Sequence, residues 1–78
     1  MERARVPLSS LRPGERGRII SLIGGWGAIS RLREMGVLPG EVVEVVSNSF
    51  GPVVIRVKGA TFAIGRGLAS RVLVEVVS

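Results

Sequence analysis

Short segments rich in Val and Ile alternate along this chain with tight turns that contain Pro and Gly. This pattern restricts the possible fold classes more than any other feature of the sequence. Within residues 52–58, Val53, Ile55 and Val57 alternate with Arg56 and Lys58, which is the period of a strand with one buried face. Five such short strands are expected, at about 17–23, 42–46, 52–58, 61–64 and 71–77. The pattern predicts an all-β domain.

The turns have recognisable chemistry. Residues 12–15 and 38–41 each place Pro at the second and Gly at the third position, which predicts two type II turns. Gly59 followed by Ala60 fits a two-residue hairpin of type II′. We assign six residues to backbone turns and not to ligands: Gly14, Gly36, Pro39, Gly40, Gly59 and Gly65.

One helix is predicted, between the first and second expected strands. Four apolar residues at helical spacing form its stripe: Ala28, Ile29, Leu32 and Met35. Gly36 ends the helix as the left-handed residue after the last turn. About nine residues are too few for a stable isolated helix, so this one must pack on the sheet.

Seventy-eight residues make one domain, too small to cover both faces of an open sheet. Closing the sheet into a barrel removes exposed edges and encloses one core. The sequence therefore predicts a small SH3-like barrel over residues 7–78, preceded by a flexible leader at 1–6. A five-stranded OB-type barrel is the structural alternative.

The sequence lacks the residues that most often carry out catalysis. The chain has no Cys and no His, so the usual general base and thiol nucleophile are missing. No glycine-rich stretch has phosphate-loop spacing, and the six Glu residues are scattered. We expect no enzyme activity, no cofactor and no metal site.

The net charge of +5 permits nucleic acid, an anionic membrane surface or an acidic protein as partner. Aromatic residues are few and do not alternate with basic ones on a strand, which disfavours nucleic acid. Four basic residues could form one patch if their strands adjoin: Arg56, Lys58, Arg66 and Arg71. The longest uncharged stretch is too short to span a membrane, and the absence of Cys favours a cytoplasmic location.

Two aromatic residues are candidates for partner contacts. Trp26 either caps the core beside the helix or is an exposed anchor, and Arg31 and Arg33 would then rim the same patch. Phe50 either folds back over one end of the barrel or is a second exposed anchor. Self-association also stays open.

Four segments stand out, in order over residues 7–77: PLSSL at 7–11 with Pro13, Gly14 and Gly17, LREMGVLPG at 32–40, GPVVIRVKG at 51–59 and AIGR at 63–66. Together they resemble the FeoA family of ferrous iron uptake. The resemblance implies an SH3-like barrel that serves as a non-enzymatic accessory protein. Its implied partner is the cytosolic part of a membrane ferrous iron permease with a GTP-binding domain.

The same module also resembles the C-terminal domain of iron- and manganese-dependent repressors. A regulatory domain of that type, which binds a proline-rich peptide, is therefore an alternative. The chain has few aromatic residues to line the groove that such a peptide needs. Members of this family are sometimes described as binding a transition metal, but the scattered Glu residues of this chain give such a site little support.

Overall fold

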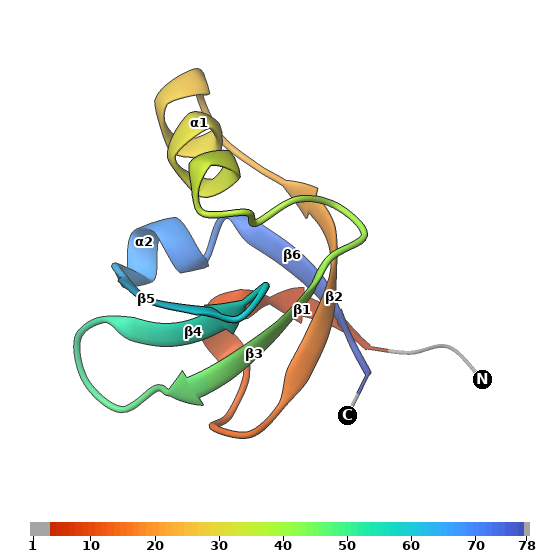
Figure 1. The fold of residues 1–78 in the computed structure, drawn as a ribbon, viewed down its shortest axis with the longest axis vertical. Coiled ribbons are helices and arrows are strands. Elements are labelled where there is room, and N and C mark those ends of the chain that lie inside the picture. The colour runs from red at the N-terminus through yellow and green to blue at the C-terminus, as the bar shows by residue number, and fades with distance from the viewer. Residues whose placement is uncertain (1–3, 78) are drawn as a thin grey trace.

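The computed structural model describes residues 4–77, which form six strands and three short helical segments (Figure 1). The strands are β1 (Arg5–Pro7), β2 (Arg16–Leu22), β3 (Val42–Ser47), β4 (Val53–Val57), β5 (Ala60–Ile64) and β6 (Val72–Val76). The helical segments are the 3-10 turn η1 (Leu8–Ser10), α1 (Trp26–Glu34) and α2 (Arg66–Ala69). All strand pairs are antiparallel, in the order β1-β6-β2-β3-β4-β5.

The predicted SH3-like, mostly β architecture is confirmed, but the strand number is not. The additional strand is β1, in which Arg5 lies opposite Glu75 and Pro7 opposite Leu73 of β6. Residues 5 and 6, which were expected to belong to a flexible leader, therefore form part of a strand. Residues 1–3 of that expected leader lie outside the described part of the chain. The predicted helix therefore follows the second strand instead of the first.

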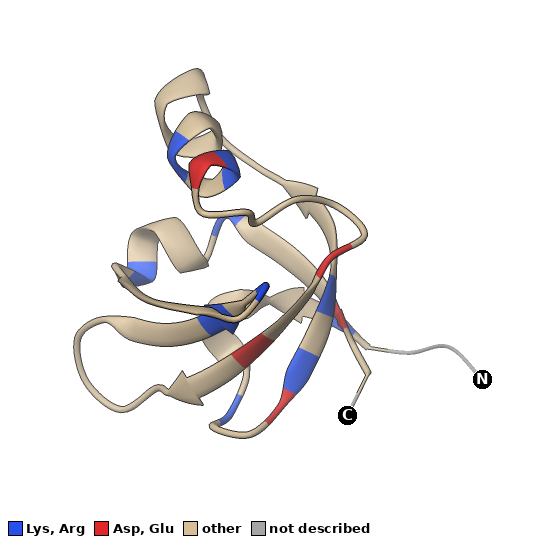
Figure 2. Cartoon of the chain, viewed as in Figure 1, with Lys and Arg blue, Asp and Glu red and all other residues tan. Residues whose placement is uncertain are grey.

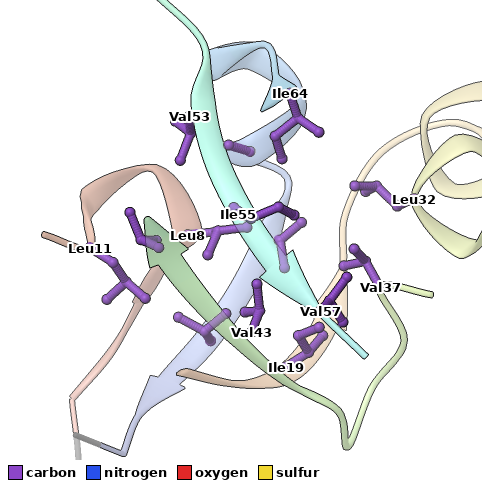
Figure 3. Packing of buried hydrophobic residues seen from close by; sticks show 14 residues of the cluster. Leu8, Leu11, Ile19, Leu32, Val37, Val43, Val53, Ile55, Val57 and Ile64 are labelled. Carbon is purple, nitrogen blue, oxygen red and sulfur yellow. The ribbon is translucent and has the colours of Figure 1, made fainter. Parts of the chain in front are cut away.

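The sheet curls around one core without joining its two ends. Alternate residues of the central strands point inward, and no strand pair links β1 to β5 in the described chain, so the expected full closure is incomplete. Leu8 of η1 and Ala69 of α2 are buried in the same core as the strands. The buried cluster is entirely apolar (Figure 3): Leu8, Leu11, Ile19, Leu32, Val37, Val43, Val45, Val53, Ile55, Val57, Ile64, Ala69, Val72 and Val74.

The two Pro-Gly turns link β2 and β3 in a reciprocal way. The turn that leads into β2 reaches β3, because the Gly14 N–H donates to the Val45 carbonyl at 2.8 Å. The turn that leads into β3 reaches β2, because the Gly40 N–H donates to the Ile19 carbonyl at 2.8 Å. These bonds satisfy backbone groups that a plain turn would leave to water.

Helix α1 is fixed to the core at its C-terminal end. The Val37 N–H donates to the Leu32 carbonyl at 3.0 Å and the Gly36 N–H donates to the Arg33 carbonyl at 3.0 Å. This pair of bonds, with Gly36 at φ +86°, is a Schellman motif. Leu32 and Val37 are both fully buried, so they attach the helix to the sheet.

The hairpin between β4 and β5 differs from the prediction by one residue. Val57 lies opposite Ala60, so the two turn residues are Lys58 and Gly59. Their φ angles are +51° and +78°, as a type I′ turn requires at both central positions. Lys58 therefore lies in a turn instead of on a strand, and the expected type II′ turn at Gly59 and Ala60 is wrong.

Replacing Lys58 with Asn is expected to raise the free energy of unfolding by about 0.5–1 kcal/mol. Asn tolerates positive φ better than Lys does. The ion pair that is lost, Lys58 Nζ to Glu41 Oε2 at 3.7 Å, is exposed and contributes little. The measurement is thermal unfolding, with an expected rise in midpoint of about 4 °C. Lys58→Gln removes the charge without easing the backbone, so a rise with Gln as large as with Asn would contradict this explanation.

Candidate partner-binding surfaces

Two large apolar side chains are exposed where β2 leads into α1. Trp26, the first residue of α1, is 80% exposed, and Ile23 three residues earlier is 55% exposed. The alternative that Trp26 caps the core is therefore wrong. Neighbouring large apolar side chains that are exposed in a small domain indicate a surface that another molecule covers.

The segment that carries Trp26 is held against the strand beside it. The Ile23 N–H donates to the Arg71 carbonyl at 2.7 Å. Gly24 has φ +126°, a backbone conformation that residues with a side chain rarely adopt. Glycine is therefore favoured where the chain turns outward to bring Trp26 to the surface.

Arg31 and Arg33 are both exposed on α1, but they lie on different faces of the helix. At about 100° per residue, Arg33 lies within roughly 20° of Trp26 around the axis, whereas Arg31 lies about 140° away. Arg33 can therefore share a contact with Trp26, and Arg31 cannot do so without a partner that wraps around the helix. We call Ile23, Trp26 and Arg33 the α1 surface.

Phe50 lies in the loop between β3 and β4 and is 96% exposed. The alternative that it folds back over the end of the barrel is wrong. Gly51, with φ +75°, follows it. Phe50 thus stands out from the sheet on a tight loop.

The Phe50 loop is tied to the body of the domain by two polar side chains. Asn48 Nδ2 donates to the carbonyls of Ser9 at 2.9 Å and Leu11 at 2.6 Å. Arg66 Nη2 donates to Asn48 Oδ1 and, at 2.9 Å, to the Ser49 carbonyl. These bonds join the loop to η1 and α2, so Phe50 is presented by an ordered segment.

The four predicted contact residues do not form one surface. Helix α1 stands at the top of the view in Figure 1, whereas the loop between β3 and β4 projects from its lower left. Trp26 and Arg33 lie on one face of α1, about two turns apart, whereas Arg31 lies on another face and Phe50 lies in the loop between β3 and β4.

The four residues of the predicted basic patch each contact a different neighbouring group. Arg56 Nη1 lies 3.3 Å from Glu44 Oε1 and Lys58 Nζ lies 3.7 Å from Glu41 Oε2. Arg66 binds the Phe50 loop, and Arg71 packs against Gly24. Basic residues are distributed over α1, α2, β2 and the hairpin between β4 and β5 (Figure 2). This distribution gives no continuous track for a phosphate backbone.

The predicted turn residues lie at the ends of elements. Four of the glycines have positive φ, and they are Gly14, Gly36, Gly40 and Gly59. Pro39 precedes Gly40 in the turn that the Leu38 carbonyl closes by accepting from the Glu41 N–H at 3.0 Å. Gly65 differs, because its φ of −63° is open to any residue and it serves as the N-cap of α2.

Within residues 4–77, acidic side chains do not gather into a group that could hold a metal ion. The same part of the chain contains no helix long and apolar enough to cross a membrane.

Two residues of these surfaces were missed by the sequence reasoning. Ile23 ends a predicted strand, and the two glycines after it are the one signal that the chain leaves the sheet there. Asn48 lies in a loop of small polar residues, and its acceptors are nearly 40 residues away in sequence. No local pattern identifies a bond of that range.

Comparisons with known proteins agree on one family. The model for the FeoA domain matches residues 6–76. The putative Fe(2+) transport protein A of Methanocaldococcus jannaschii is 42% identical over 69 residues, which cover 88% of this chain and 84% of that protein.

Solved structures are similar over most of the chain. A crystal structure of an iron uptake regulatory protein (FeoA) is 41% identical, with a TM-score of 0.91, over 95% of this chain and 100% of that one. The zinc complex of FeoA from Stenotrophomonas maltophilia, described as a prokaryotic SH3 domain protein, is 28% identical. Its TM-score is 0.79, over 87% of each chain.

Proposed function

Because the chain belongs to the FeoA family of non-enzymatic accessory proteins in ferrous iron transport, we propose that it acts by docking on the membrane ferrous iron permease, ferrous iron transport protein B. The docking site is on the cytosolic part of the permease, which places the chain in the cytoplasm. The observation that carries the proposal is Trp26, which begins α1 with 80% of its surface exposed.

The α1 surface supplies the first contact. Trp buries more apolar area than any other side chain when it enters a pocket, and Trp and Arg are enriched among residues that dominate binding energy. Arg33 on the same helix face is positioned to meet a carboxylate at the rim of that pocket. The permease surface is therefore expected to combine an apolar hollow with acidic residues.

Docking is rigid in this proposal. Leu32 and Val37 fix the C-terminal end of α1 in the core, and the segment before Trp26 is bonded to Arg71. A preformed surface loses little conformational entropy on binding. Phe50, on its own ordered loop, and Arg31 would contact other parts of the permease, and the bound chain would thereby modulate assembly or the nucleotide cycle of the permease.

Trp26→Ala is expected to weaken binding to the permease at least tenfold, because the largest apolar contact of the α1 surface is removed. The measurement is a titration of the full-length permease in lipid nanodiscs with the labelled chain. Val46→Ala is the matched control, since Val46 is an exposed apolar residue on β3, outside α1. Equal affinities of wild type and Trp26→Ala would remove Trp26 from the contact.

A further inference from the structure

The two ends of the sheet are protected to very different degrees. The β1 edge is three residues long and carries Arg5 and Pro7, and both a charge and a proline discourage the addition of another strand. The β5 edge is five residues long, with the sequence ATFAI. It contains no charge and no proline, and its pairing with β4 runs without a bulge.

The free side of β5 offers unused backbone groups. In a hairpin with a two-residue turn the closing pair is hydrogen-bonded, and bonded and non-bonded pairs then alternate. Since Val57 and Ala60 close this turn, the N–H and C=O of Thr61 and Ala63 point away from β4. Among residues 4–77, neither Thr61 nor Ala63 makes a hydrogen bond outside the pairing of β5 with β4.

The approach to this edge is open. Ala60, Thr61 and Ala63 are exposed, and their side chains are short. Another backbone can therefore come to the usual strand spacing of about 4.8 Å without displacing a long side chain. On the inner face Phe62 is half-buried against the core, so an apolar side chain of an added strand would extend the core beside it.

The charges around β5 select the kind of strand. Lys58 lies in the turn before β5 with its Nζ 3.7 Å from Glu41 Oε2, and Arg56 lies opposite Thr61 on β4 with its Nη1 3.3 Å from Glu44 Oε1. Arg66 follows the other end of β5 and bonds to Asn48 and the Ser49 carbonyl, neither of which carries a charge. Because the two ion pairs are exposed and weak, the surroundings of β5 keep a positive balance. A second copy of this chain, paired antiparallel through its own β5, would bring the Lys58 end of one copy to the Arg66 end of the other. Like charges would then meet at both ends, in a chain whose net charge is already +5.

We propose that β5 is a docking edge at which an extended, acidic segment of a partner protein adds a seventh strand to the sheet. Backbone bonds to Thr61 and Ala63 hold the segment, as in β-augmentation. An apolar residue of the segment packs beside Phe62, and its acidic residues face Lys58 and Arg66. The inference rests on the proposed function, because the segment is taken to belong to the permease.

The test uses Ala63→Pro, which removes the outward N–H of Ala63 at a position where an edge strand accepts proline. Ala63→Ser is the matched control, because it keeps that N–H. In titrations of the full-length permease in nanodiscs, Ala63→Pro is expected to bind at least tenfold more weakly than wild type. Ala63→Ser is expected to stay within twofold.

Hydrogen exchange of the wild-type chain keeps the inference testable if Ala63→Pro fails to fold. The amides of Thr61 and Ala63 are expected to become protected when the permease is added. Equal binding by the Pro and Ser variants, or unchanged exchange at β5 in the complex, would overturn the docking edge and leave the proposed function standing. Protection that rises with the concentration of the chain alone would also overturn it, in favour of a second copy. No binding by wild type would remove both proposals.

Discussion

Replacing Gly17 with alanine is expected to lower the free energy of unfolding by about 3 kcal/mol, a large share of the stability of a 78-residue domain. Gly17 is buried in β2, between β6 and β3. A Cβ there would lie 2.8 Å from both Cβ and Cγ2 of Val74 and 3.4 Å from Leu11 Cδ1. The closest atom is attached directly to the backbone of β6, so a change of side-chain rotamer cannot relieve the contact.

Thermal unfolding measures this effect, with an expected fall in midpoint of about 15 °C. Gly27→Ala is the matched control because it makes the same chemical change in open space, where no atom lies within 4 Å of the new methyl group. Gly27 lies in α1, where alanine is favoured, so the control is expected to gain about 0.5 kcal/mol. Equal effects of the two substitutions would show that β2 and β6 do not approach as closely as described.

The inward-facing residues of β4 were readable in the sequence because the period of two persists along that strand. Val53, Ile55 and Val57 are buried as the alternation in 52–58 predicts. The turns at 12–15 and 38–41 could be predicted because Pro fixes φ at one position and Gly permits a positive φ at the next. Both signals are local and repeated.

The elements that escaped prediction are too short to show a period. Strand β1 has three residues, and only its pairing with β6 defines it. Helix α2 has four residues and includes Gly67, so it shows no helical period in the sequence. In the β4–β5 hairpin the sequence marks a turn at Gly59, but the register that places Lys58 in the turn depends on the pairing of the two strands.

The candidate surfaces were harder to predict than the fold. The sequence supplies Trp26 and Phe50 as large side chains beside glycines, which is equally consistent with a capped core and an exposed anchor. The choice depends on whether another element lies over the ring, and that is a tertiary property. Both proved exposed, and the separation of α1 from the loop between β3 and β4 follows from the sheet order.

Asn48→Ala is expected to lower the free energy of unfolding by about 2–3 kcal/mol. Asn48 Nδ2 donates to the carbonyls of both Ser9 and Leu11 at 2.9 and 2.6 Å, and Asn48 is partly buried. Alanine leaves both carbonyls without this donor, which costs about 1–3 kcal/mol for each group that water cannot reach. Chemical denaturation with urea measures the loss, with an unchanged slope as the sign of an unaltered folded state.

Two further variants separate the amide bonds to η1 from the bonds made by Arg66. Asn48→Asp keeps an acceptor for Arg66 but cannot donate to Ser9 and Leu11, so it is expected to be at least as unstable as Asn48→Ala. Arg66→Ala removes only bonds of an exposed side chain and is expected to cost less than about 1 kcal/mol. If Asn48→Asp were as stable as wild type, the order of the Phe50 loop would have to come from Arg66. Because a carboxylate cannot replace two N–H donors, the bonds from Asn48 to η1 are the contact that decides whether Phe50 is presented rigidly.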